Sequence, residues 1–457
     1  MNLFLQSDPR HLHFVGIGGA GVSALAMIAL RRGIRVTGSD ADPSGAGDLV
    51  ARGATVYSGD GTAGVMGARA VVASAAVPAS NPDLVRAGEL GIPVVQRKVA
   101  LAGLIGDATN VAVAGTHGKT TTTVMTTEAL VGAGFDPTGL AGGRVAAWGG
   151  NAKLASDDLF VVEADEYDQA FLTLRPTVAV INNVEPDHLE CYGSVEAMEA
   201  AYVQFAAPAA RVLVGNADPG TDRVVSAMGR DRVWRFGPGA ADLEMSAIDL
   251  TPTGSAVSLR APDGRTVVLR LGVPGLHNLR NATAAVGAVI ALGGDPEAAA
   301  AALARFRGVG RRFDRVGEAG GVVVIDDYAH HPTELVATLA GARQAFPTRR
   351  LVAAFQPHLY SRTALHAEAM GTALAGADLA VVTDVYRARE QPMPGVTGAL
   401  VAEAARRRGG AVRYHPDRAT LGEAVLGLLT PGDVLVTMGA GDITQLGPEI
   451  LGRLAPR

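Results

Sequence analysis

A glycine-rich segment with a single lysine is the part of the chain whose residue types most clearly predict chemistry. Gly115-Thr-His-Gly-Lys-Thr-Thr121 follows an apolar run, Asn110–Ala114, and precedes a helix expected from about 120 to 131. Backbone amides in such a loop can bind phosphate, the lysine can reach β- and γ-phosphates, and the following threonine can bind Mg²⁺. The full motif has a glycine where this chain has Val113, so the loop is a shortened form.

A second glycine loop lies near the start of the chain. Gly16-Ile-Gly-Gly-Ala-Gly21 contains G-x-G-x-x-G between an expected strand, 11–16, and an expected helix, 20–32, and Asp40 lies at the end of the next expected strand. Glycines in this context let backbone N–H groups approach a diphosphate at a helix N-terminus. The motif predicts a diphosphate but not nicotinamide, because a UDP-sugar carries the same group. Two such loops predict two phosphorylated ligands, whereas a dehydrogenase needs one.

Carboxylates follow two expected strands of the central region. Glu163-Ala-Asp-Glu166 follows the strand 159–162, and Glu185-Pro-Asp-His188 follows the strand 177–181. Because parallel strands end at one edge of a sheet, these groups should converge beside the phosphate loop, where Mg²⁺ is usually held. The segment Asp326-Asp-Tyr-Ala-His-His331 resembles a metal cluster in composition, but we interpret it as a polar loop that faces substrate.

The elements that must position these loops alternate along the chain. Short apolar runs alternate with helix-like stretches, which predicts α/β domains with parallel sheets. We expect a Rossmann-like domain over residues 1–106, a P-loop ATPase-like domain over 107–308 and a second Rossmann-like domain over 309–457, with hinges near 107 and 308. Within the central domain, 232–272 alternates polar and apolar residues between turn signals, which predicts antiparallel hairpins.

Composition excludes several classes of protein. The 457 residues carry a net charge of −5, which lacks the basic footprint of a nucleic-acid binder. The single cysteine, Cys191, excludes a disulfide framework and any multi-cysteine metal site, and we expect it to be a buried structural thiol. No stretch is typical of a signal peptide or membrane span, so we expect a cytoplasmic protein without membrane insertion.

Motifs along essentially the whole chain resemble, in the same order, those of the ATP-dependent Mur ligases of peptidoglycan synthesis. The matching segments are Gly115-Thr-His-Gly-Lys-Thr-Thr-Thr-Thr123, Glu163-Ala-Asp-Glu166, Glu185-Pro-Asp-His188, His277-Asn-Leu-Arg-Asn281, Gly310-Arg-Arg-Phe-Asp314, Asp326-Asp-Tyr-Ala-His-His-Pro-Thr-Glu334 and Phe355-Gln-Pro-His358. The resemblance implies three domains, which bind a UDP-sugar, ATP with Mg²⁺, and an amino acid. It implies the ligation of L-alanine to UDP-N-acetylmuramate, with ADP and phosphate as the other products, by a monomer or weak homodimer.

The same resemblance implies roles for individual residues. Catalytic roles fall on Lys119, Glu163, His188, Arg312 and His330. ATP would contact Gly115, Thr116, His117, Gly118, Lys119, Thr120, Thr121, His277, Asn281, Arg312 and Asp327. The UDP-sugar would contact Gly16, Gly18, Gly19, Gly21, Asp40 and Ser74. The amino acid would contact Tyr328, His330 and Arg362, and the metal would be held by Thr120, Glu163 and His188.

Two features bear on which member of the family the chain resembles. Leu359 stands where relatives often have an arginine after Gln-Pro-His, so another group would have to bind the carboxylate of the amino acid. No lysine follows Lys153, so the carbamylated lysine of several sibling ligases is excluded. The alternatives are a ligase that attaches an intact tripeptide to UDP-N-acetylmuramate, an NAD-dependent oxidoreductase and a non-catalytic nucleotide switch.

Overall fold

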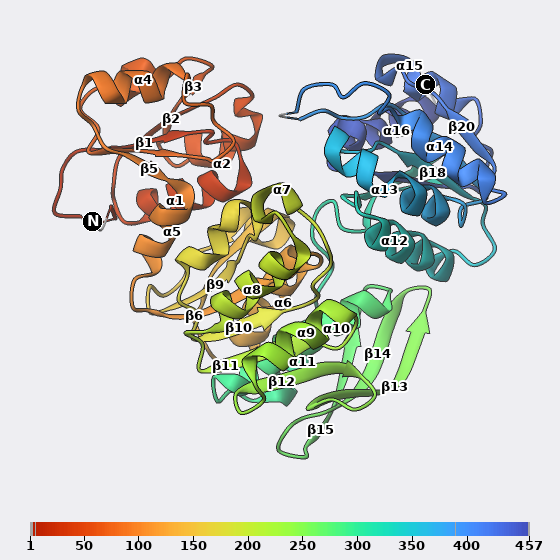
Figure 1. Cartoon of the computed structure of the whole chain (residues 1–457), viewed down its shortest axis with the longest axis horizontal. Helices are drawn as coiled ribbons and strands as arrows, with labels where there is room; N and C mark the ends of the chain where they lie inside the picture. Colours follow the sequence, from red (N-terminus) through yellow and green to blue (C-terminus); the bar gives the residue numbers. More distant parts are fainter. Residues whose placement is uncertain (1–2, 5, 389, 456–457) are drawn as a thin grey trace. The chain divides into compact units, whose positions relative to one another are not determined.

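The computed structural model describes residues 3–4, 6–388 and 390–455. Its helices and strands build three sheets, and Figure 1 shows the elements in chain order. The contacts divide the chain into two compact units. The first comprises residues 1–248, 256–271 and 279–306, and the second comprises residues 249–255, 272–278 and 307–457. The first unit contains the first sheet and most of the second, and the second unit contains the third sheet.

The first sheet has five parallel strands in the order β3-β2-β1-β4-β5. The strand order reverses at β1, which pairs with both β2 and β4, so the loop after β1 lies at the topological switch point. Apolar clusters cover both faces of the sheet, which explains why the central strands β1 and β4 are buried along their whole length. The elements are β1 (Leu12–Val15), α1 (Ala20–Arg31), β2 (Val36–Asp40), η1 (Pro43–Ala46), α2 (Gly47–Val50), β3 (Thr55–Ser58), α3 (Thr62–Val65), β4 (Ala70–Ala73), α4 (Pro82–Glu89), β5 (Val94–Gln96) and α5 (Arg97–Ile105).

The second sheet has ten strands in the order β15-β14-β13-β12-β11-β10-β6-β9-β7-β8. Strand β6 lies between β10 and β9, and both pairings are parallel, so the loop after β6 again lies at a switch point. The strands are β6 (Thr109–Ala114), β7 (Thr138–Val145), β8 (Gly150–Lys153), β9 (Leu159–Glu163), β10 (Val178–Ile181), β11 (Arg211–Gly215), β12 (Val233–Pro238), β13 (Leu243–Thr251), β14 (Gly254–Arg260) and β15 (Thr266–Leu271). The helices are α6 (Lys119–Gly132), η2 (Ala146–Trp148), η3 (Tyr167–Thr173), α7 (Leu189–Tyr192), α8 (Val195–Ala206), α9 (Pro219–Met228), α10 (Leu276–Ala291) and α11 (Pro296–Leu303).

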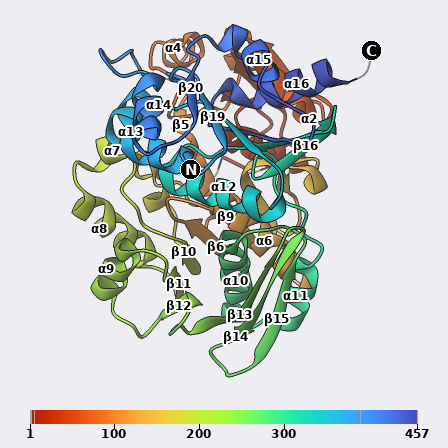
Figure 2. The same cartoon turned by 90° about the vertical axis from the view of Figure 1, so that its right-hand side faces the viewer.

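The region predicted as antiparallel hairpins begins with a strand that pairs in parallel. Strand β12 pairs in parallel with β11 and β13, so the prediction for 232–272 is wrong over its first strand. The remaining strands β13, β14 and β15 are consecutive neighbours joined by short turns, as hairpins require. Figure 2 shows these three strands side by side near α10 and α11.

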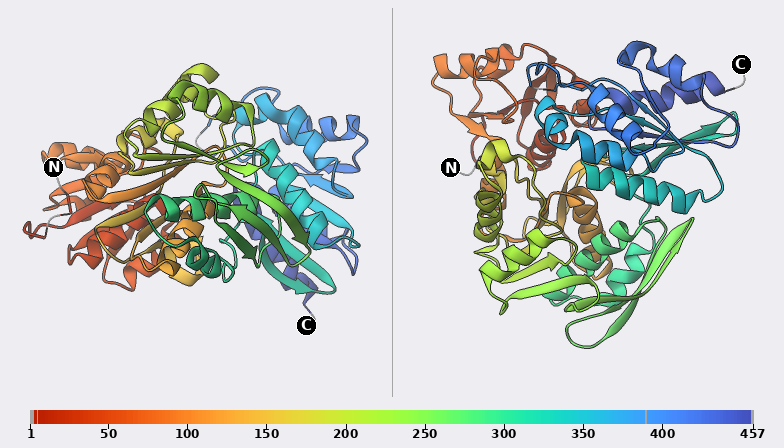
Figure 3. Two further views of the ribbon diagram at one scale, coloured as in Figure 1. Left: turned by 90° about the horizontal axis from the view of Figure 1, so that it is seen from below. Right: turned by 45° about the vertical axis from the view of Figure 1, so that its right-hand side comes forward.

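The third sheet has six strands in the order β16-β17-β21-β18-β19-β20. Only the β16–β17 pair is antiparallel, and helices cover both faces, as the blue ribbons in Figure 3 show. The elements are β16 (Asp314–Ala319), β17 (Val322–Asp327), α12 (Pro332–Ala345), β18 (Leu351–Phe355), α13 (Tyr360–Leu374), β19 (Leu379–Val382), α14 (Gly398–Arg407), β20 (Val412–Tyr414), α15 (Arg418–Leu426), β21 (Val434–Met438), η4 (Asp442–Gln445) and α16 (Leu446–Leu454).

These sheets confirm the predicted α/β class with a mixed central sheet. Each sheet falls within one of the three predicted ranges, whose exact boundaries stay predictions. Among the described helices, none combines the length and apolar character needed to cross a membrane. Cys191 is partly exposed, which contradicts the expectation of a buried thiol.

Candidate active site

The predicted phosphate loop joins β6 to α6 through two glycines with left-handed backbone angles. Gly118 caps the N-terminus of α6 at φ +77°, and Gly115 has φ +131°. A side chain at either position would also meet a neighbour, because a Cβ at Gly115 would lie 3.0 Å from Asn182 and one at Gly118 would lie 2.8 Å from the Oδ1 atom of Asn281. Glycine at both positions is therefore required by the turn and by close packing.

Lys119 is held by an ion pair and by the loop itself. Its Nζ donates to Glu166 Oε1 at 2.7 Å, to the Gly115 carbonyl oxygen at 2.7 Å and to the Thr116 carbonyl oxygen at 3.3 Å. Burial disfavours the charged form of Lys119, but the charges of Glu166 and Asp165 outweigh burial and raise its pKa. The lysine is therefore a cation at neutral pH, fixed beside the loop amides.

Thr120 and Glu163 meet as the sequence predicts. The Thr120 hydroxyl lies 2.9 Å from Glu163 Oε2 and 3.1 Å from Oε1. The parallel register of β6 and β9 explains this approach, because Glu163 lies beside Val113 at the carboxyl edge of the sheet. The Gly142 N–H also donates to Glu163 Oε2, at 2.7 Å. Carboxylate and hydroxyl oxygens are the ligand types that Mg²⁺ prefers.

Gly142 leaves little room beside the Glu163 carboxylate. A Cβ at this position would lie 2.5 Å from Glu163 Oε2, so Gly142→Ala must displace the carboxylate. We expect kcat to fall about 10- to 100-fold, as misplacement near 1 Å does in other enzymes, with a raised Mg²⁺ requirement. Phosphate release measured across a Mg²⁺ titration checks this, with Gly88→Ala as control, because open space surrounds Gly88. An unchanged Mg²⁺ dependence would contradict this role of Gly142.

The loop after β10 forms hydrogen bonds with the phosphate loop. Asn183 Oδ1 accepts from the His117 N–H at 2.7 Å, and Asn182 Nδ2 donates to the His117 carbonyl oxygen at 3.2 Å. Thr116 exchanges hydrogen bonds with the backbone of Glu185, at 2.9 and 3.1 Å. The second carboxylate cluster thus converges on the phosphate loop, as its position after a neighbouring strand predicts.

His188 lies beside the same acidic segment. Its ring packs edge-on against Tyr167 with centroids 5.1 Å apart, and Tyr167 directly follows Glu166. Its Nδ1 lies 3.4 Å from a Glu190 oxygen, and its backbone is left-handed at φ +52°. The positive φ of a non-glycine residue turns the chain sharply at the start of α7. Its metal-binding role stays a prediction.

The predicted adenine-side residues lie on α10. Asn281 is brought to the phosphate loop, since its side chain limits the space at Gly118. His277 lies four residues earlier on the same helix, a spacing that places both side chains on one face. The structure thus brings Asn281 to the predicted ATP site, and the contacts of His277 with a nucleotide stay a prediction.

In the first sheet, the glycine loop is built around Asp40. Asp40 Oδ2 accepts from the Gly18 N–H at 2.8 Å, and Oδ1 accepts from the Asp42 N–H at 3.0 Å. Ser74 lies next to Gly16, whose φ is +79°. Asp40 therefore holds the loop, and its negative charge disfavours a diphosphate directly on the Gly18 amide. Gly19 is the N-cap of α1 and Gly21 lies in its first turn, where the helix terminus favours an anion.

In the second unit, Asp327 organises the end of β17. Its Oδ2 accepts from the Phe313 N–H and its Oδ1 from the Ala329 N–H, both at 2.7 Å. Burial raises the pKa of Asp327 to about 6, and the charge of Arg312 opposes this. Arg312 lies over the Tyr328 ring at 4.9 Å. Asp327 is buried at the end of β17, so this part of the segment predicted as a polar, substrate-facing loop is a strand.

The residues predicted to surround the amino acid form one chain of contacts. The ring of His330 packs edge-on against Tyr328 at 5.3 Å and lies 5.9 Å from the ring of His358. His358 Nδ1 lies 3.3 Å from Nη1 of Arg362, which is buried. The structure therefore brings Tyr328, His330 and Arg362 together around His358.

Leu359 is buried and has φ +68°, so it cannot present a charge to this cluster. A positive φ at a leucine is costly, and the Leu359 N–H donates to the Tyr386 carbonyl oxygen at 3.0 Å, which helps to hold it. Arg362, one turn along α13 and 3.3 Å from His358, offers this cluster a guanidinium that can bind a carboxylate.

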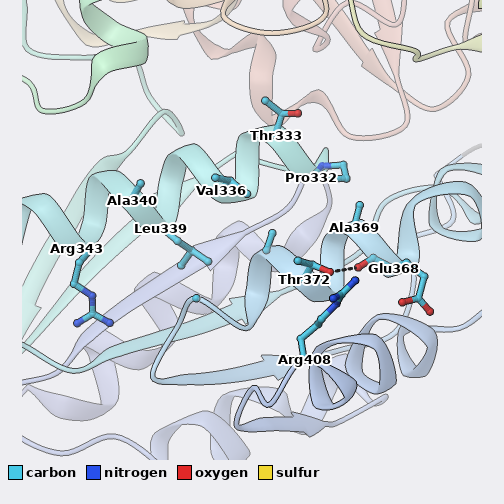
Figure 4. Close-up of a pocket in the computed structure, with 12 residues that line it drawn as sticks. Pro332, Thr333, Val336, Leu339, Ala340, Arg343, Glu368, Ala369, Thr372 and Arg408 are labelled. Atoms are coloured by element: carbon cyan, nitrogen blue, oxygen red, sulfur yellow. Dashed lines mark hydrogen bonds between the residues drawn. The ribbon is translucent and has the colours of Figure 1, made fainter. Parts of the chain in front are cut away.

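A cavity of about 840 Å³ lies elsewhere in the second unit, between α12 and α13 (Figure 4). Val336 and Leu339 from α12 face Ala369 and Thr372 from α13, and Arg408 reaches in from the end of α14. None of the site residues predicted from the sequence lines this cavity. The predicted amino-acid site is thus separate from it.

Sequence reasoning missed four residues that shape these sites: Gly142, Asn183, Glu166 as the partner of Lys119, and His358 as the centre of the second cluster. Asn183 and Glu166 carried a signal, since each follows a strand that ends beside the phosphate loop. Gly142 carried none, because its contact with Glu163 depends on the distant pairing of β7 with β9.

Family models and relatives of known name all match this chain to Mur ligases. Three family models match in order: "Mur ligase family, catalytic domain" over residues 11–109, "Mur ligase middle domain" over 113–289 and "Mur ligase, glutamate ligase domain" over 311–441. A UDP-N-acetylmuramate–L-alanine ligase from Mycobacterium sp. (strain JLS) is 45% identical and covers 99% of this chain and 97% of its own length. One from Kineococcus radiotolerans is also 45% identical, with 98% and 96% covered.

Solved structures agree with these sequences. A UDP-N-acetylmuramate-alanine ligase from Thermotoga maritima is 28% identical, has a TM-score of 0.84 and covers 97% of this chain and 99% of its own. A murein peptide ligase from Psychrobacter arcticus is 25% identical, with a TM-score of 0.75 and 98% and 99% covered. With the full span matched and the motifs assembled as expected, the chain belongs to the Mur ligase family.

Proposed function

We propose that this chain is an enzyme that ligates L-alanine to UDP-N-acetylmuramate, with ATP converted to ADP and phosphate, in peptidoglycan precursor synthesis. The observation that carries the proposal is the phosphate loop, in which Lys119 and Thr120 meet the acidic residues that follow β9. Relatives with 45% identity over nearly the full chain carry the name of this activity. A Mur ligase of known structure with ADP supports the use of ATP by the family.

The reaction needs an activated carboxylate. The sugar's carboxylate oxygen attacks the γ-phosphorus of ATP, the bond to the β–γ bridging oxygen breaks, and ADP leaves. The amine of alanine then attacks the carbonyl carbon of the acyl phosphate. Phosphate departs with the former carboxylate oxygen, and the amine loses a proton. The first step brings two anions together, so its barrier depends on nearby positive charge.

The phosphate loop supplies that charge. Lys119 is fixed beside the loop amides, where it would contact the transferring phosphoryl group. Gly118 and Lys119 carry amides at the start of α6, where the helix dipole favours an anion, whereas the His117 N–H is already bound by Asn183. The loop thus offers a lysine, backbone N–H groups and a helix terminus to one phosphate chain, and Asn281 lies next to it for the nucleoside side.

The donor set at Thr120 and Glu163 fits Mg²⁺. Both residues present oxygen, and the Glu163 carboxylate is oriented by the Thr120 hydroxyl and the Gly142 N–H. We propose that Thr120, Glu163 and His188 hold the metal, with ATP phosphate oxygens and water completing the site. Bound there, Mg²⁺ would neutralise charge on the transferring phosphoryl group.

The cluster in the second unit is proposed to bind alanine. Arg362 would pair with its carboxylate, and Tyr328 and His330 would line the space around its amine. Arg312 is proposed to contact phosphate from its position over Tyr328. In the first sheet, Gly16, Gly18, Gly19, Gly21, Asp40 and Ser74 are proposed to form the UDP-sugar site, in which Asp40 holds the loop through the Gly18 N–H.

Phosphate release tests the proposal directly. With UDP-N-acetylmuramate and ATP present, each amino acid is supplied in turn, and L-alanine should give the fastest release. Competition between L-alanine and a cell-wall tripeptide tests the alternative of a ligase that attaches an intact tripeptide to UDP-N-acetylmuramate. Release that depends on the tripeptide and not on alanine would assign that function instead. Cytoplasmic location and a monomer or weak homodimer stay predictions.

A further inference from the structure

The acidic segment after β9 contacts two different parts of the first unit. Glu163 and Glu166 bind Thr120 and Lys119 of the phosphate loop. Two other carboxylates of this segment, Asp165 and Asp168, contact the start of α5. This helix follows β5, the edge strand of the first sheet.

Two consecutive cations at the start of α5 receive these contacts. Lys98 Nζ donates to Asp168 Oδ2 at 2.7 Å and to the Asp168 carbonyl oxygen at 2.9 Å. Arg97 Nη2 reaches Asp165 Oδ2 only at 3.4 Å, although the two aspartates are similarly exposed, at 41% for Asp165 and 45% for Asp168. The lysine pair is therefore a short, fixed contact, whereas the arginine pair is long and easily exchanged.

Arg97 also lies directly against the glycine loop of the first sheet. A Cβ at Gly21 would lie 2.9 Å from Arg97 Cδ, 3.1 Å from Nη1 and 3.2 Å from Nε. Glycine at position 21 thus makes room for the guanidinium as well as for a backbone approach. Neither Gly18 nor Asp40 makes this contact, so Arg97 adds a charge to the loop that the glycine motif does not contain.

The helix termini at this position favour an anion over a cation, and the Asp165 carboxylate meets Arg97 only at 3.4 Å. Cations in the first turn of a helix oppose the helix dipole, and Arg97 and Lys98 both occupy the first turn of α5. The same guanidinium also lies at the positive N-terminus of α1. A diphosphate at this point would be bound by the guanidinium and the N-terminus of α1 together, with charge-assisted hydrogen bonds from Arg97.

We propose that Arg97 binds the diphosphate of the sugar nucleotide, and that its exchange from Asp165 to the diphosphate links occupancy of this loop to the acidic segment of the ATP site. This inference rests on the proposed function, because it takes the sugar nucleotide as the ligand of the first glycine loop. Lys98 remains paired with Asp168 and keeps α5 attached to the acidic segment while Arg97 changes partner.

The test is calorimetry of the full-length enzyme with UDP-N-acetylmuramate alone. Arg97→Gln should weaken binding about 10- to 100-fold, the loss expected for a hydrogen bond to a charged group. The affinity of Arg97→Lys should lie between those of the wild type and Arg97→Gln, because lysine keeps the charge and loses the guanidinium geometry. Arg86→Gln is the matched control, because Arg86 pairs only with Glu89 on α4 among the described contacts, and it should bind like the wild type.

Asp165→Asn tests the exchange separately. Removal of the competing carboxylate should tighten sugar-nucleotide binding about 2- to 5-fold, since the pair it breaks is partly exposed. Weaker binding by this variant would overturn the exchange. In steady state, Arg97→Gln should raise the KM for UDP-N-acetylmuramate and leave the KM for L-alanine unchanged, a split that general misfolding does not produce.

Failure of this inference differs from failure of the proposed function. A wild-type enzyme that forms product while Arg97→Gln binds the sugar nucleotide with wild-type affinity would overturn the role of Arg97 alone. A wild-type enzyme that releases no phosphate with UDP-N-acetylmuramate and L-alanine would overturn the function itself. Equal melting temperatures of Arg97→Gln and Arg97→Lys would show that their different affinities do not come from stability.

Discussion

Lys119→Ala is expected to abolish turnover, with kcat reduced on the order of 10³-fold or more, and to leave binding of UDP-N-acetylmuramate intact. The loss follows from the removal of a fixed cation beside the transferring phosphoryl group. Binding of the sugar nucleotide should persist because its proposed loop lies after β1, in a different sheet. Phosphate release measures the first effect, and calorimetry with the sugar nucleotide alone measures the second.

The design of this test must account for Glu166. One oxygen of its buried carboxylate binds Lys119, and the other has no hydrogen-bond partner among the described residues. Lys119→Ala would leave this group without its counter-ion, which destabilises a protein. The double variant Lys119→Ala/Glu166→Gln removes both charges, and it should fold and remain inactive. Lys153→Ala makes the same change at a partly exposed lysine on β8 of the second sheet, and this variant should stay active. Activity in the double variant would contradict the role of Lys119.

Glu163→Gln should have the second largest effect, with a fall in kcat of about 10²- to 10³-fold and a raised Mg²⁺ requirement. The amide oxygen of glutamine can still accept from the Gly142 N–H and the Thr120 hydroxyl, so the fold should persist. What is lost is the negative charge that would bind the metal.

A Mg²⁺ titration of phosphate release measures this effect. Asp158→Asn removes a carboxylate from the other end of the same strand, where it is exposed, and should behave like the wild type. If Glu163→Gln kept the wild-type Mg²⁺ dependence, Glu163 would not be a metal ligand.

Much of the ATP site could be predicted because its residues follow strands that end at one sheet edge. Lys119 follows β6, Glu163 ends β9 and His188 follows β10, and these three strands are neighbours. A short apolar run before each polar residue carries that information locally. Once the strands are parallel and adjacent, their carboxyl ends must converge.

The features that could not be predicted depend on pairing between distant segments. Strand β12 carries no local signal that distinguishes parallel from antiparallel pairing, so its prediction failed. The Gly142–Glu163 bond and the Arg97–Asp165 pair join residues 21 and 68 positions apart. Leu359 shows the same limit, because its positive φ follows from the position of β18 and the Tyr386 loop and not from leucine itself.

In the proposed reaction, the carboxylate of UDP-N-acetylmuramate is activated by phosphorylation at the Lys119 loop. Oxygen transfer tests it most directly. UDP-N-acetylmuramate labelled with ¹⁸O in its carboxylate is converted with ATP and L-alanine, and the released phosphate is analysed by mass spectrometry. An acyl phosphate predicts one ¹⁸O atom in each phosphate, because the carboxylate oxygen departs with it. Phosphate that contains no ¹⁸O while product forms would contradict the account.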